Sequence, residues 1–162
     1  MAGHLPSRHL AVFYGGGPES VGLVGFSQGA CLSTEFVARH PRRYGGVAAL
    51  SGGLVGPLGA DFEARFNVGN AGNTRSAGKV GKAKNPGEAS PPSGSRGPLS
   101  GTPIFLGCSD VDPHIPEERV HESGRVLDAL GGRVTVRIYP GMAHTVNDDE
   151  IGRVRALLQG LS

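Results

Sequence analysis

Short apolar runs and stretches with a helical spacing of apolar residues alternate along most of the 162-residue chain. Four of the runs are each followed by serine, glycine or proline, which is typical of strands. They lie at Val21–Phe26, Val47–Leu50, Ile104–Leu106 and Val134–Tyr139. Three other stretches repeat apolar residues at helical spacing, which predicts helices. They lie at Gln28–Arg39, Pro116–Leu130 and Asp148–Leu161.

Two of the predicted helices also carry signals at their ends. Pro116 suits a first turn because its ring fixes φ near the helical value, and the two glutamates that follow it favour the positive end of the helix dipole. Asn147 is expected to cap the last helix. Strands that alternate with helices predict a parallel sheet, because a parallel connection needs a helix to cross over the sheet. The predicted fold class is α/β, with a mostly parallel sheet and flanking helices.

Residues 69–100 break this pattern. The segment from Gly69 to Ser100 consists mainly of Asn, Gly, Lys, Ser and Pro and contains almost no apolar residue to bury. Such a segment cannot offset the entropy that it would lose on ordering. We therefore expect a single domain over residues 1–162 that contains a disordered insertion at 69–100.

Charge and cysteine content exclude several partners and settings. The formal net charge is +2, and much of the positive charge lies between Arg75 and Arg96, so no nucleic-acid partner is expected. Cys31 and Cys108 are too few for a disulfide framework, which favours a reduced, cytoplasmic setting. No stretch approaches the roughly 20 apolar residues that cross a bilayer, so we expect a soluble protein with no membrane span. The oligomeric state is left open.

Gly25-Phe26-Ser27-Gln28-Gly29 matches the pattern G-x-S-x-G between a predicted strand and a predicted helix, which is the context that gives this motif its meaning. The glycines permit a tight turn that leaves the Ser27 hydroxyl accessible at the end of the sheet. The backbone N–H of Gln28 would then face the oxygen that becomes negative in a tetrahedral intermediate. The motif predicts that Ser27 is a nucleophile, and the alternative is a purely structural turn.

A nucleophilic serine needs a base, and around this type of turn the chain order is Ser, then Asp or Glu, then His. Asp112 and His144 supply that order, each in a loop after a predicted strand, at the same edge of the sheet as Ser27. We expect His144 to transfer the proton and Asp112 to hold the imidazole tautomer. Asp110 is the alternative acid, and Asp112 is favoured because it directly precedes a rigid Pro-X-X-Pro turn.

The remaining histidines and the cysteines fit this chemistry less well. His114 lies in a suitable loop but is too near Asp112 in sequence to be oriented by it easily, and His40, before a proline, is expected at a helix end. The other three lack the chain order and the loop context, namely His4, His9 and His121. Cys31 and Cys108 are expected to be small packing residues.

These motifs resemble the phospholipase/carboxylesterase family of α/β-hydrolases, which includes acyl-protein thioesterase-like enzymes and small bacterial esterases. The resemblance is carried by GFSQGA at Gly25–Ala30, ARHPRRYGGVAALSGGL at Ala38–Leu54, TPIFLGCSDVDPHIP at Thr102–Pro116 and YPGMAHTVNDDEI at Tyr139–Ile151. It implies an α/β-hydrolase fold and a serine hydrolase of small-molecule carboxylic esters or thioesters. It also implies an acyl-serine intermediate and a reaction without a cofactor or metal.

Two features depart from the family pattern. Members carry, upstream of the nucleophile, a first strand and a His-Gly loop whose backbone N–H is the second oxyanion donor. Here Gly15–Gly17 follows the apolar run Leu10–Tyr14 and is expected to be a connector, so we expect an N-terminally shortened fold. The second departure is the insertion at 69–100. The alternative expectation is therefore a truncated, weakly active or non-catalytic remnant that lacks a complete oxyanion hole.

Overall fold

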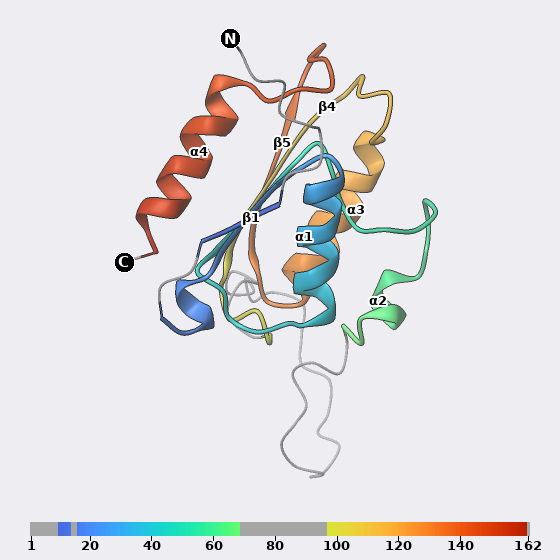
Figure 1. Ribbon diagram of the computed structural model, residues 1–162. Coiled ribbons are helices and arrows are strands. Elements are labelled where there is room, and N and C mark those ends of the chain that lie inside the picture. The colour runs from blue at the N-terminus through green and yellow to red at the C-terminus, as the bar shows by residue number, and fades with distance from the viewer. Residues whose placement is uncertain (1–9, 14–15, 69–96, 162) are drawn as a thin grey trace, which may run out of the picture.

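The computed structural model describes residues 10–13, 16–68 and 97–161, which form one sheet with helices on both of its faces (Figure 1). The strands are β1 (Leu10–Phe13), β2 (Gly22–Phe26), β3 (Gly46–Leu50), β4 (Pro103–Ser109) and β5 (Arg133–Tyr139). The helices are α1 (Gln28–Arg39), α2 (Phe62–Arg65), α3 (Glu117–Ala129) and α4 (Asp148–Gln159), and a short 3₁₀ helix, η1, covers Pro18–Ser20.

The order of the strands in the sheet follows their order in the chain. Strands β2 to β5 run parallel, and β1 pairs with β2 in the antiparallel direction at one edge. Helices α1 and α3 cover one face of the sheet and α4 covers the other (Figure 1). Because parallel strands end on the same side, the loops that follow β2, β4 and β5 meet along one edge of the sheet.

The middle of the sheet is apolar on both faces. Successive side chains of a strand point to opposite faces. Val47 and Ala49 accordingly join the large core cluster under α1 and α3, whereas Ala48 and Leu50 join a smaller cluster with Val154 of α4. We call these the α1/α3-side cluster and the α4-side cluster. Burial from both sides explains why β3 has no polar residue.

The sequence-based elements are confirmed, with changes at their ends. All four predicted strands and all three predicted helices are present, and the largest difference is at β4, which extends the predicted strand Ile104–Leu106 through Ser109. The predicted α/β class with a mostly parallel sheet is also confirmed. The sequence analysis missed β1, which lies within the apolar run Leu10–Tyr14, and the four-residue helix α2.

The predicted insertion falls mostly outside the described residues, because these leave out 69–96. Its last residues, 97–100, are described. Leu99 is 0% exposed, and its N–H donates to the Leu130 carbonyl at 3.0 Å. A Cβ on Gly97 would lie 2.2 Å from the same carbonyl oxygen. Residues 97–100 therefore contact the end of α3, and the expected disorder of the insertion stays a prediction.

Candidate active site

Ser27 occupies the turn between β2 and α1 with φ 55° and ψ −117°, in the positive-φ region that residues other than glycine rarely adopt. Its N–H donates to the Leu50 carbonyl of the neighbouring β3 at 2.8 Å, and its own carbonyl accepts from the Cys31 N–H at 3.1 Å. Strained residues persist only where their surroundings fix them, and such residues cluster at functional sites. The predicted strand-to-helix turn is present, with Ser27 at its apex.

Glycines make room for this turn. A Cβ on Gly25 would lie 2.2 Å from the Gly29 carbonyl oxygen. A Cβ on Gly52, just after β3, would lie 2.4 Å from the Ala30 Cβ and 2.9 Å from the Ser27 carbonyl oxygen. The backbones of β2, α1 and the loop after β3 thus approach too closely for a side chain at either position. The first glycine of the motif is required by this packing.

Replacing Gly25 with alanine is expected to destabilise the chain by about 1–3 kcal/mol or more, because the added methyl group overlaps backbone atoms that cannot rotate away. The measurement is the free energy of unfolding from urea denaturation. The matched control is Gly152→Ala in α4, where the new Cβ would meet nothing within 4 Å. Alanine there is expected to stabilise the helix by about 0.5–1 kcal/mol. Two variants of equal stability would contradict the packing account.

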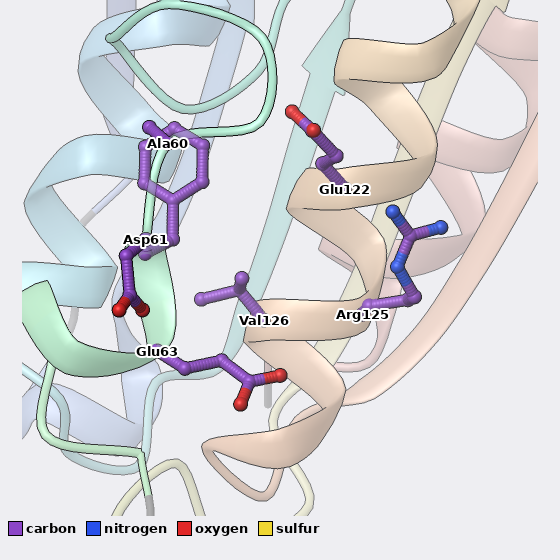
Figure 2. Close-up of a pocket in the computed structure, with 7 residues that line it drawn as sticks. Ala60, Asp61, Glu63, Glu122, Arg125 and Val126 are labelled. Carbon is purple, nitrogen blue, oxygen red and sulfur yellow. The ribbon is translucent and has the colours of Figure 1, made fainter.

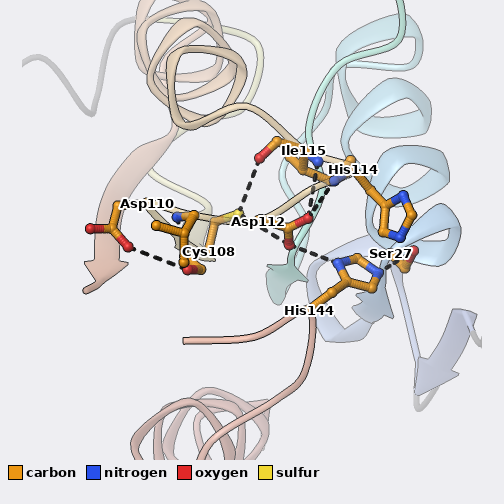
Figure 3. A network of polar contacts seen from close by, with 9 residues as sticks. Ser27, Cys108, Asp110, Asp112, His114, Ile115 and His144 are labelled. Atoms are coloured by element: carbon orange, nitrogen blue, oxygen red, sulfur yellow. Dashed lines mark hydrogen bonds and ion pairs between the residues drawn. The ribbon is translucent and has the colours of Figure 1, made fainter. Parts of the chain in front are cut away.

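The structure brings Ser27, His144 and Asp112 together at the carboxyl edge of the sheet (Figure 3). The Nε2 atom of His144 lies 2.9 Å from Ser27 Oγ, and its Nδ1 atom lies 2.7 Å from Asp112 Oδ2. Ser27 follows β2, Asp112 follows β4 and His144 follows β5. The hydroxyl, imidazole and carboxyl groups therefore have the contacts that transfer of the serine proton requires.

The Asp112 side chain is fully buried and uses both of its oxygens. Oδ2 faces His144, while Oδ1 accepts from the N–H groups of His114 at 2.8 Å and Ile115 at 3.1 Å. Burial acts to raise the pKa of Asp112, but the hydrogen bonds from His144 and from the two N–H groups outweigh it, so the pKa lies below its usual value. Asp112 therefore faces His144 as a carboxylate at neutral pH.

Two rings contact the His144 imidazole. The Phe26 ring centroid lies 4.9 Å from that of His144, and the His114 ring meets it edge-on at 4.8 Å (Figure 3). The sequence analysis set His114 aside because it lies so near Asp112. In the structure His114 contacts both partners, Asp112 through its backbone and His144 through its ring. Its place within the Asp-Pro-His-Ile-Pro loop was the signal that could have found it.

Asp110, the alternative acid, has a different partner. Its Oδ1 accepts from the Gly141 N–H at 2.7 Å, in the loop that leads to His144. Asp110 is exposed, whereas Asp112 is buried beneath the imidazole. Asp110 thus connects the loop after β4 to the loop after β5, and Asp112 is the carboxyl group that contacts the His144 imidazole.

Neither cysteine occupies the position that Ser27 has beside the His144 imidazole. Cys108 is fully buried in β4, with its Sγ 3.8 Å from Asp112 Oδ2. Burial, and after it the charge of Asp112, raises the pKa of the Cys108 thiol to about 11, so the thiol stays protonated at neutral pH. Cys31 is half-buried in the first turns of α1.

The other histidines lie elsewhere. His40 ends α1, as expected, and its ring contacts Phe36. His121 pairs with Glu117 at 3.2 Å on the exposed side of α3. His4 and His9 lie outside the described residues.

Gln28, the predicted source of an oxyanion donor, is the first residue of α1. Backbone N–H groups in the first turn have no partner within the helix and lie at the positive end of its dipole. This position, next to Ser27, suits an oxygen that gains negative charge during reaction. Of the predicted connector Gly15–Gly17, Gly15 lies outside the described residues and the other two lead into η1.

A separate hollow of about 200 Å³ lies between α2 and α3 (Figure 2). It is lined by Ala60, Asp61, Phe62, Glu63, Glu122, Arg125 and Val126. Ser27, Asp112 and His144 are not among these residues, so the hollow is distinct from the site at the sheet edge.

The residues that the structure describes were also searched for membrane spans and metal sites. None of their helices has the length and apolar character needed to span a bilayer. These residues also contain no group of three or more His, Cys, Asp or Glu side chains that could hold a metal ion.

Comparison with known proteins identifies relatives of this chain. The family model described as phospholipase/carboxylesterase matches residues 12–69, which include the Ser27 turn. A crystal structure of a phospholipase/carboxylesterase from Dyadobacter fermentans is 30% identical with a TM-score of 0.63, over 88% of this chain and 54% of that one. The predicted resemblance to the phospholipase/carboxylesterase family of α/β-hydrolases is confirmed. The predicted α/β-hydrolase fold is confirmed as well.

Two curated proteins are also similar to this chain. Acyl-protein thioesterase 1 of Gibberella zeae is 27% identical over 142 residues, which are 88% of this chain and 48% of that protein. Acyl-protein thioesterase 1 of Candida albicans is 27% identical over 144 residues, which are 88% of this chain and 50% of that protein. The chain thus spans about half the length of these relatives.

Proposed function

We propose that this α/β-hydrolase chain carries the catalytic site of a serine hydrolase that cleaves small carboxylic esters or thioesters through an acyl-serine intermediate. The observation that carries the proposal is the pair of contacts made by His144, at 2.9 Å to Ser27 and 2.7 Å to Asp112. The similarity to two acyl-protein thioesterases supports thioesters as one class of substrate.

In the first half of the reaction Ser27 Oγ attacks the carbonyl carbon of the substrate, while His144 Nε2 takes the hydroxyl proton. The carbonyl oxygen becomes negative and accepts a hydrogen bond from the Gln28 N–H. The tetrahedral intermediate then collapses, and His144 gives its proton to the departing alcohol or thiol. The products are the leaving group and an ester between the acyl group and Ser27.

In the second half a water molecule takes the place of the leaving group. His144 removes a proton from this water, the resulting hydroxide adds to the acyl carbon, and the proton passes to Ser27 Oγ as the acyl–oxygen bond breaks. A carboxylic acid leaves and Ser27 is regenerated. Asp112 remains a carboxylate throughout, and its negative charge stabilises the imidazolium that forms in each half.

The number of oxyanion donors sets the rate that this site can reach. Gln28 supplies one N–H from the start of α1. Loss of one such donor typically lowers turnover by about 10²–10³-fold. A chain with Gln28 as its single donor is thus a weak hydrolase that works through Ser27, and a chain with a second donor is an efficient one.

The test is the time course of p-nitrophenol release from p-nitrophenyl acetate mixed with the purified chain. Acylation of Ser27 releases p-nitrophenol before the acyl-serine is hydrolysed. We therefore expect a rapid burst of about one equivalent per chain, followed by slower steady release. A time course no faster than that of buffer alone would contradict the proposal.

A further inference from the structure

Glu150, in the first turn of α4, is 0% exposed although it carries a carboxyl group. Its Oε2 accepts from the Asn147 N–H at 2.9 Å, and its own N–H donates to Asn147 Oδ1 at 2.9 Å, which makes a capping box. The other oxygen, Oε1, is buried and has no hydrogen-bond partner among the residues that the structure describes. A capping box does not require a buried carboxyl group, so the burial of Glu150 needs a further explanation.

The buried oxygen lies directly over β4. A Cβ on Gly107 would be 2.3 Å from Glu150 Oε1, so the carboxyl group occupies the space that a side chain at this position of the strand would take. Glycine inside a strand often marks the close approach of another group. Burial of a polar atom without a partner costs roughly 1–3 kcal/mol. Two unfavourable choices, a strand glycine and a buried carboxyl group, thus coincide where the start of α4 meets β4.

Asn147 connects Glu150 to His144. Its side-chain Nδ2 lies 3.1 Å from Met142 Sδ, so the cap of α4 also holds the segment 142–147, which contains His144. Val146, in the same segment, packs against the α4-side cluster. The position of the imidazole relative to Ser27 therefore depends on how firmly Asn147 is held.

We propose that Glu150 is a positioning residue, whose carboxyl group, seated over Gly107, fixes Asn147 and thereby holds His144 at hydrogen-bonding distance from Ser27. This inference rests on the proposed function, in which His144 transfers the proton. Burial is the main cause that raises the pKa of Glu150, and the charge of Asp149 adds to it. Glutamine has the same shape and no charge, so it is the conservative replacement.

The kinetic test compares Glu150→Ala, Asn147→Ala and Glu150→Gln in the full chain with p-nitrophenyl acetate as substrate. The two alanine variants are expected to lower kcat by about 10–10²-fold with little change in KM, because a small displacement of the base slows proton transfer but leaves substrate binding intact. Glu150→Gln is expected to keep most of the wild-type kcat. If Glu150→Ala alone fails to fold, Asn147→Ala still tests the connection to His144.

Leu157→Ala is the matched control for stability. Leu157 lies in the last turns of the same helix, where its side chain packs on Gly46, away from the cap. The Leu157→Ala substitution is expected to lower the free energy of unfolding while kcat stays near the wild-type value. A fall in kcat as large as that of Glu150→Ala, at the same loss of stability, would overturn the positioning role. Wild-type kcat in both alanine variants would also overturn it.

A second readout does not depend on activity. In ¹H NMR the Nδ1–H proton of His144, which is hydrogen-bonded to Asp112, is expected to give a far-downfield signal that Glu150→Gln keeps and Glu150→Ala loses. This pattern in a chain that does not hydrolyse the ester would support the positioning role and refute the proposed function. A signal that persists unchanged in Glu150→Ala would refute the positioning role alone.

Discussion

Alanine at position 27 is expected to lower kcat for p-nitrophenyl acetate by about 10⁶-fold, because the substitution removes the atom to which the acyl group would be transferred. The oxyanion donor and the binding surface remain in this variant. They retain about 10³–10⁴-fold catalysis over water in serine hydrolases that lack a member of the triad. The measurement is steady-state p-nitrophenol release, with the initial burst recorded in the same experiment.

Ser33→Ala is the control for this result. Ser33 lies in α1, the helix that begins directly after Ser27. Its side chain is fully buried and donates to the Gly29 carbonyl at 2.8 Å. The variant removes a hydroxyl group six residues beyond Ser27 and is expected to keep kcat within about threefold, because this bond only supplements the hydrogen bonds of the helix. A burst that survives Ser27→Ala, or one that disappears in Ser33→Ala, would show that another residue carries the acyl group.

Asparagine at position 112 is expected to lower kcat by about 10⁴-fold, as loss of the corresponding charge does in other serine hydrolases. In the wild-type chain the backbone N–H groups of His114 and Ile115 both donate to Asp112 Oδ1. The amide oxygen of asparagine must face these two donors, which turns its NH₂ group toward His144 Nδ1. The imidazole then accepts at Nδ1 and carries its proton on Nε2, where it can no longer take the proton of Ser27.

Asp110→Asn is the matched control, because the same chemical change is made two residues away. The asparagine oxygen can still accept from the Gly141 N–H, so kcat is expected to stay within about threefold of wild type. The comparison is made from kcat values together with urea denaturation of both variants. A larger loss of kcat in Asp110→Asn than in Asp112→Asn would reverse the assignment of the acid.

Local patterns in the sequence were enough to predict most of the fold. The strands β2 to β5 and the helices α1, α3 and α4 each contain several apolar residues at the spacing that their burial requires, so they could be found one at a time. In contrast, β1 has four residues and becomes a strand by pairing with β2. Leu99 is an apolar residue near the end of a polar segment, and its position is fixed by Leu130 at the end of α3.

The features of the candidate site likewise fall into two groups, those with a local signal in the sequence and those set by contacts between elements. The motif around Ser27 and the order of Asp112 and His144 could be read along the chain, because each residue follows a strand. The choice between Asp110 and Asp112 depends on which residue of the loop after β5 each carboxyl group reaches, Gly141 or His144, and that is set by the packing of β4 against β5. Asn147 was predicted as the cap of α4, and Glu150 three residues later completes a local capping-box signature that was not recognised. The burial of Glu150 has no local signature, because it arises from Gly107 on another element.

The central claim is that Ser27 is the residue that becomes acylated, and active-site labelling tests it most directly. The purified chain is treated with a fluorophosphonate, which reacts with activated serines, and the adduct is located by mass spectrometry of its peptides. We expect one adduct per chain on Ser27, no adduct in Ser27→Ala and much slower labelling in Asp112→Asn. An adduct on Cys31 or on a different serine, with Ser27 unmodified, would contradict the account.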